Sequence, residues 1–120
     1  MRIKLYVDVA EYAERGEAFL EKATDDIGFL ARRDPSDPMH TERLGAQLRL
    51  LAPEAVHEPW AAFLKAEDMI IWELHEGSPN LGLQGRPYLD AEDPLITNAV
   101  AALNELRKQL KIALQDPDKT

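Results

Sequence analysis

The sequence predicts an all-α fold, an antiparallel helical bundle of three main helices with a proline-broken middle helix. Apolar residues recur at steps of three and four near both ends of the chain, which places them along one side of a helix. Proline-containing segments separate these stripes. The first stripe comprises Leu5, Val9, Tyr12, Gly16, Phe19, Ala23, Ile27 and Leu30, and the last comprises Leu95, Ala99, Leu103, Leu106, Leu110 and Ala113. Because a helix with one apolar side must bury that side, we expect the helices to pack on one another.

The chain length of 120 residues predicts a single helical domain, 1–120. No cysteine is present, so disulfides and thiolate metal sites are excluded. No apolar stretch approaches the roughly 20 residues that span a bilayer, and the first residues lack the apolar stretch of a signal peptide. We therefore expect a cytoplasmic protein, and the sequence leaves open whether a membrane anchor precedes it.

The charge balance is acidic, with 22 aspartates and glutamates against 14 lysines and arginines and a net charge of −8. Binding to nucleic acid relies on cationic side chains that displace counterions, so no nucleic-acid partner is expected. Anionic membrane surfaces are disfavoured for the same reason. The excess of acidic residues is typical of a soluble surface, and the alternative is a partner with a basic groove.

The first helix is predicted over about residues 5–32. Residues 2–9 also alternate between apolar and polar side chains, which is typical of a strand, so this segment is either helix or strand. A lone strand would need a partner, and no convincing second strand is evident. The prolines at 35 and 38 end the helix, because a residue before proline is pushed out of helical geometry.

The middle helix is predicted over 41–76, broken near 52–58 by Pro53 and Pro59, each of which removes a backbone donor. One arrangement has a helical turn at 53–57 and a further helix from 59, and the alternative is one long kinked helix. A loop follows over 77–92, and loops of this length are often functional. The last helix, 93–115, begins with Asp93 as the cap and Pro94 at the first position.

No metal site is predicted, although each histidine lies near a glutamate. The pairs are Glu54 and His57, Glu73 and His75, and His40 and Glu42. The first pair has the spacing that helical di-iron proteins use, but those sites need a second such pair and two further glutamates. The other pairs are two residues apart, which points the side chains away from each other on a helix.

The acidic residues of the first helix are expected to form a solvated face. They are Glu11, Glu14, Glu17, Glu21, Asp25 and Asp26. Helical nucleotide pyrophosphatases resemble this pattern, but they require a second acidic pair on the following helix, and no Glu-x-x-Asp or Glu-x-x-Glu is present between residues 26 and 72. The serines at 36 and 78 lie beside prolines, and Gly82 and Gly85 lack the lysine of a phosphate-binding loop. The sequence thus predicts no catalytic residue, no cofactor and no enzymatic activity.

The two tryptophans, Trp60 and Trp72, have two interpretations. Tryptophan is enriched at the centres of protein interfaces, so either residue could anchor a partner. Both lie at helical spacing from Phe63 and Leu64, which favours the core for both residues.

A short run, Leu48-Arg-Leu-Leu-Ala-Pro-Glu-Ala-Val56, is flanked by an acidic amphipathic helix and a closing leucine-rich, lysine- and arginine-containing helix. In this order of helices the chain resembles small uncharacterised actinobacterial helical proteins. Several of these carry a membrane helix before the helical region. The resemblance implies a helical fold and no established activity.

The resulting functional prediction is a small intracellular helical interaction module that associates with itself or with a protein partner through an apolar helix face. A helix over 5–32 would be roughly 40 Å long, and shorter neighbours could not cover it, so we expect a homodimer. One alternative is an acidic decoy that occupies the basic nucleic-acid-binding groove of a partner. A second is a metal-dependent hydrolase that uses Glu54, His57 and glutamates of the first helix.

Overall fold

The fold is known from a computed structural model that describes residues 2–25, 38–77, 80–82, 85 and 87–115. Within these residues the chain forms four helices and one pair of two-residue strands. The helices are α1 (Arg2–Ala23), α2 (Pro38–Leu51), α3 (Glu54–Glu76) and α4 (Pro94–Gln115), and the strands are β1 (Asn80–Leu81) and β2 (Pro87–Tyr88). The all-α class predicted from the sequence is confirmed.

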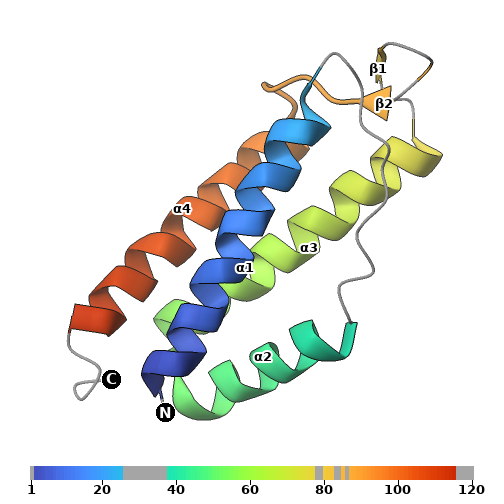
Figure 1. Ribbon diagram of the computed structural model, residues 1–120. Helices are drawn as coiled ribbons and strands as arrows, with labels where there is room; N and C mark the ends of the chain where they lie inside the picture. The colour runs from blue at the N-terminus through green and yellow to red at the C-terminus, as the bar shows by residue number, and fades with distance from the viewer. Residues whose placement is uncertain (1, 26–37, 78–79, 83–84, 86, 116–120) are drawn as a thin grey trace.

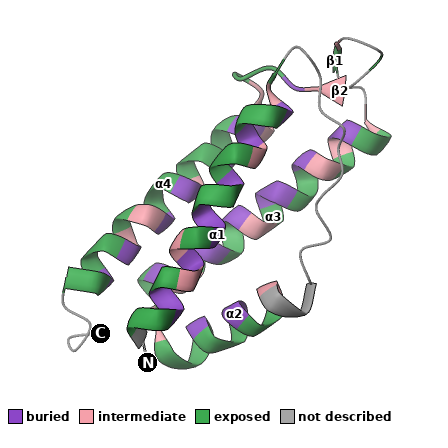
Figure 2. Cartoon of the chain, in the orientation of Figure 1, coloured by how far each residue is buried: buried purple, intermediate pink, exposed green. Residues whose placement is uncertain are grey.

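The three longer helices lie side by side along the molecule (Figure 1). The chain runs in the same general direction in α1 and α3 and in the opposite direction in α4, which packs against both. The shorter α2 packs against α3 and α1 near the end of the molecule where α3 begins. Buried residues concentrate on the sides of the helices that face one another (Figure 2).

Helix α1 begins at Arg2, so the alternating residues 2–9 form helix and not strand. The burial pattern gives the reason. Leu5 and Val9, four residues apart, are buried, whereas Ile3 and Val7 are exposed. A strand would have placed all four on one face, and the helix places only part of them toward the core.

The same helix ends at Ala23, whereas the sequence predicts helix to about residue 32; residues 26–37 lie outside the described part. The Thr24 hydroxyl donates to the carbonyl oxygen of Leu20 at 3.0 Å, and the Asp25 amide donates to that of Lys22 at 3.2 Å, which tightens the last turn. The amide of Leu89 donates to the carbonyl oxygen of Ala23 at 2.8 Å. A carbonyl at the helix end is thereby satisfied from outside the helix.

The middle of the chain is divided into α2 and α3 at residues 52 and 53. Pro53 has an extended backbone (φ −67°, ψ 155°), and its carbonyl oxygen accepts the amides of Val56 at 2.9 Å and His57 at 3.2 Å. The predicted break over 52–58 is therefore too wide, and Pro59 is wrong as a breaking point, because it is buried inside α3. It removes one hydrogen bond near the start of the helix, and the burial of its ring offsets that loss.

The connection before α4 contains the two short strands, which pair antiparallel with Asn80 opposite Tyr88. The side-chain amide of Asn80 donates to Oδ1 of Asp90 at 3.1 Å. Next to β2, Leu89 is buried in the main core, which fixes this connection to the helices. The predicted cap of the last helix is present, since Oδ1 of Asp93 accepts the amide of Leu95 at 2.9 Å.

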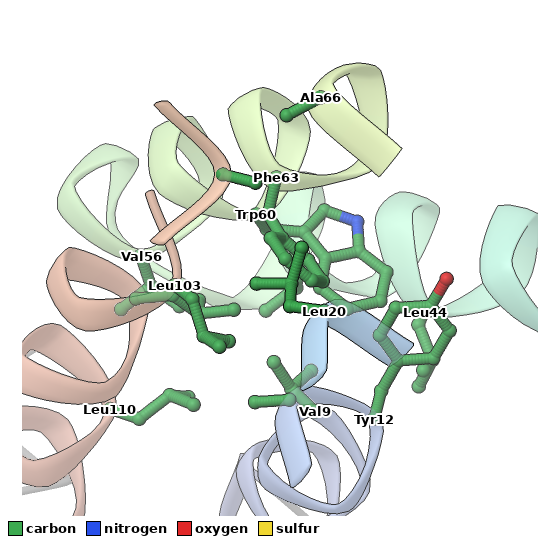
Figure 3. Close-up of a cluster of buried hydrophobic side chains, with 14 of the residues drawn as sticks. Val9, Tyr12, Leu20, Leu44, Val56, Trp60, Phe63, Ala66, Leu103 and Leu110 are labelled. Atoms are coloured by element: carbon green, nitrogen blue, oxygen red, sulfur yellow. The ribbon is translucent and has the colours of Figure 1, made fainter. Parts of the chain in front are cut away.

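One hydrophobic core joins all four helices, as the side chains in Figure 3 show. Tyr12 of α1 and Trp60 of α3 meet edge to face, with ring centroids 5.0 Å apart and planes inclined by 62°. Gly16 lies directly against the ring of Phe63, and a methyl group on this glycine would come within 2.6 Å of Cε2. Both predicted stripes therefore supply core residues, and the glycine in the first stripe leaves room for the ring of Phe63 on α3.

Candidate interaction surface on α3

The two tryptophans of α3 lie in opposite environments. Trp60 has 1 % of its surface exposed and belongs to the core, whereas Trp72 has 60 % exposed. The core interpretation is thus confirmed for Trp60 and wrong for Trp72. A separation of 12 residues turns the second side chain by about 120° relative to the first. This rotation can be calculated from the sequence. It means that the two tryptophans cannot both lie at the centre of one buried stripe.

Trp72 belongs to a continuous row along the outer side of α3, which we name the α3 seam. Its members are Glu58, Ala62, Lys65, Met69, Trp72 and Glu76, and every one of them is exposed. The steps between them are four, three, four, three and four residues. This is the spacing with which one helix presents a narrow seam to another helix. The seam turns away from the buried residues of α3 that pack against the other helices.

Three of the six seam residues, Ala62, Met69 and Trp72, are apolar; Lys65 lies between Ala62 and Met69, and a glutamate lies at each end. Met69, with 45 % of its surface exposed, lies one turn before Trp72. Other exposed apolar side chains are present, for example Ile112 on α4 with 50 % exposed, and isolated residues of this kind are common on protein surfaces. An exposed tryptophan beside a methionine is different, because both residue types are enriched in the buried centres of protein interfaces.

The histidine–glutamate pairs noted in the sequence are not brought together into a metal site within the described residues. Glu54 is exposed on the first turn of α3, and His57 is half-buried at the edge of a pocket of about 450 Å³ between α2 and α3. Within the described residues, no three histidine, aspartate or glutamate side chains are placed to share a metal ion. Glu73 is half-buried and His75 exposed, and the side chain of His40 lies outside the described part.

The pocket between α2 and α3 is mixed in character. Its lining residues are Thr41, Glu42, Gly45, Arg49, His57, Trp60, Ala61 and Leu64. Arg49 and His57 offer cationic or donor groups, and Glu42 offers the opposite charge. No single class of ligand is indicated by this set.

The acidic face of α1 is exposed as expected. Glu11, Glu14, Glu17 and Glu21 lie on α1, Asp25 lies two residues beyond its end, and Asp26 lies outside the described residues. One of them also links two helices, because Nη2 of Arg107 on α4 donates to Oε2 of Glu17 at 2.6 Å. This hydrogen bond, together with the charge of Arg107, lowers the pKa of Glu17 below its ordinary value of 4.5.

The remaining candidates add no site. The serines at 36 and 78 lie outside the described residues, and Gly85 adopts a positive φ of 72° in the turn between the strands, where glycine is favoured. In the part of the chain that the structure describes, no helix has both the length and the apolar character needed to cross a membrane.

The fold and the surface together define a small all-α chain that presents a tryptophan-centred seam to solvent. Comparisons with protein-family models, with curated proteins and with solved structures gave no match. The geometry and chemistry of the α3 seam are therefore the features that indicate a function.

Proposed function

We propose that this chain is a helical interaction module that binds a protein through the α3 seam. The observation that carries the proposal is the 60 % exposure of Trp72. Burying that exposed part would remove on the order of 100–150 Å² from water, which is worth about 3 kcal/mol at roughly 25 cal/mol per Å². Trp72 contributes to the fold only through its covered part, so most of this free energy is left for a partner.

The rest of the fold acts as a rigid support for the α3 seam. In this proposal α1, α3 and α4 are the three main helices of an antiparallel bundle, and α2 is the shorter segment separated from α3 by Pro53. The buried side of α3 is fixed by Trp60 and Phe63, among others. A seam held in one conformation loses little conformational entropy when a partner binds, which favours affinity.

The test compares two lysine substitutions of exposed apolar residues in an affinity capture from the native host. Trp72→Lys places a charge in the middle of the α3 seam, and Ile112→Lys places the same charge on the exposed side of α4, away from the seam. Circular dichroism and thermal unfolding should show both variants folded, because both side chains project into solvent. We expect Trp72→Lys to lose at least tenfold of the bound partner and Ile112→Lys to retain it.

Two outcomes would contradict this proposal. Equal capture by wild type and Trp72→Lys would remove the α3 seam as the binding surface. Loss of the partner between about 50 and 500 mM salt, with no effect of Trp72→Lys, would instead point to the acidic face of α1 and to the decoy function. Binding through an apolar seam depends only weakly on salt.

A further inference from the structure

We infer that the occupant of the α3 seam is a second copy of the same seam in antiparallel orientation, with Trp72 of each copy seated on Ala62 of the other. This inference rests on the proposed function and names its partner. The first support is a match of size. Ala61 and Ala62 are both exposed, and their methyl groups leave the helix surface low at this point. A large ring and a small residue on the same seam are complementary to each other.

Two-fold symmetry makes the match reciprocal. In a dimer of this symmetry, if residue i of one copy contacts residue j of the partner, then residue j of the first copy contacts residue i of the partner in the same way. Seating Trp72 on Ala62 of the second copy therefore also seats Ala62 under Trp72 of that copy. The two positions are ten residues apart, roughly 15 Å along the helix, so the two rings do not compete for space.

The same register also matches the centre of the α3 seam in charge. Lys65 then lies opposite Met69 of the second copy, and its aliphatic stem can cover the thioether. Its ammonium group lies beside Asp68 of the second copy, which is exposed one position before Met69. Symmetry repeats this contact, so two cations and two anions alternate around the two-fold axis. A parallel pair would instead place Lys65 against Lys65 and Trp72 against Trp72.

The ends of the α3 seam weaken the dimer. In the antiparallel register Glu58 lies opposite Glu76 of the second copy, and this contact between like charges occurs twice. The seam contributes six residues from each copy, compared with roughly 20–30 residues a side in a standard interface. We therefore expect a dissociation constant in the range of about 10–100 μM, without a permanent dimer.

The first experiment changes these end contacts so that the dimer becomes more stable. A variant that folds poorly would not show tighter association. Glu76→Lys turns both end contacts into pairs of opposite charge, and sedimentation equilibrium at low salt should show a dissociation constant about three- to tenfold lower than in wild type. Adding Glu58→Lys restores like charges at both ends and should cancel the gain. A parallel dimer predicts no gain from Glu76→Lys alone, because that change only exchanges one like-charge contact for another.

The second experiment measures the orientation directly, and the absence of native cysteine makes it simple. Two variants, Glu58→Cys and Glu76→Cys, are oxidised separately and as an equimolar mixture. In an antiparallel dimer of one variant, the two identical cysteines lie roughly 27 Å apart along the helix axis. In a dimer of one Glu58→Cys and one Glu76→Cys copy, the two cysteines lie opposite each other. We expect disulfide-linked dimers in the mixture and few in either single sample.

The outcomes separate this inference from the function on which it rests. A wild-type protein that stays monomeric to about 300 μM, while the partner from the host is still captured through Trp72, overturns the second copy as occupant and leaves the interaction module intact. Crosslinks within each single-cysteine sample overturn the antiparallel register. A monomer that also captures no partner through Trp72 removes both proposals.

Discussion

The hydroxyl of Tyr12 donates a hydrogen bond to Oε1 of Glu67 at 2.6 Å, across 55 residues of sequence and between α1 and α3. Both residues are 6 % exposed, and Glu67 is the buried charged residue of the described core. A carboxyl group removed from water needs hydrogen-bond donors to offset its lost hydration. The tyrosine supplies one such donor while its ring packs against Trp60.

We predict that Tyr12→Phe lowers the free energy of unfolding by about 1–3 kcal/mol. Phenylalanine keeps the aromatic contact with Trp60, so the loss reports mainly the missing donor to the buried Glu67. Urea unfolding followed by circular dichroism measures this difference. A change below about 0.5 kcal/mol would mean that another donor replaces the tyrosine hydroxyl.

Tyr6 provides the matched control for this deletion, because it lies in the same helix and is fully buried. Its hydroxyl oxygen has no hydrogen-bond partner among the described residues. Removing a buried polar atom that lacks a partner also removes its desolvation penalty. We therefore predict that Tyr6→Phe leaves the stability unchanged or raises it by up to about 1 kcal/mol, measured by the same urea unfolding. A loss comparable to that of Tyr12→Phe would reveal a partner for the Tyr6 hydroxyl.

Gly16 is predicted to stabilise the fold because a larger side chain would not fit at this position. Alanine is favoured over glycine in a helix by about 1 kcal/mol, but the added methyl group would overlap the ring of Phe63, which is fully buried and cannot swing into solvent. Overpacking of this kind costs typically 1–3 kcal/mol. Subtracting the gain in helix propensity, we expect Gly16→Ala to be less stable than wild type by up to about 2 kcal/mol in thermal or urea unfolding.

Gly45 of α2 is the control for Gly16. A methyl group on Gly45 would meet Nε1 of Trp60 at 3.4 Å, an ordinary contact distance. Gly45→Ala should thus gain part of the helix propensity, up to about 1 kcal/mol.

The double variant Gly16→Ala with Phe63→Leu should be more stable than the sum of its single changes predicts, since the smaller side chain relieves the overlap. Additive losses would argue against a direct contact between the two residues.

The sequence predicted the parts of the fold that depend on local periodicity. The stripe from Leu5 to Ala23 and the cap at Asp93 are found in the structure because a single helix determines which residues share a side. The early end of α1 was not predictable in this way. It involves the amide of Leu89, which arrives from a distant connection.

The surface was harder to predict than the core, because exposure depends on which neighbouring helix covers which side. Pro59 was expected to break a helix, and its burial in α3 reflects packing that no local rule reports. Glu67 was not singled out at all, since the hydrogen bond that Tyr12 donates to this buried carboxyl group comes from a helix 55 residues away in the sequence. The core position predicted for Trp72 was likewise wrong, although its rotation of about 120° relative to Trp60 is a local signal that separates the two residues.

The ion pair between Glu17 and Arg107 predicts a specific dependence of stability on pH. In the folded chain the pKa of Glu17 lies below its ordinary value of 4.5, first because Arg107 donates a hydrogen bond to it and second because of the charge of Arg107. A carboxyl group with a lowered pKa stabilises the fold fully above its unfolded pKa. That stabilisation is lost as the pH falls through the lowered pKa.

We therefore predict that Glu17→Gln lowers the urea midpoint slightly at pH 7 and that this difference disappears under acidic conditions below the lowered pKa. The effect should be small and should shrink in high salt, because Glu17 is exposed and solvent screens the pair. Arg107→Gln should give the same pH dependence, and the double variant should lose no more than either single change. A difference between wild type and Glu17→Gln that stays constant from pH 7 to strong acid would show that the glutamate contributes through packing and not through its charge.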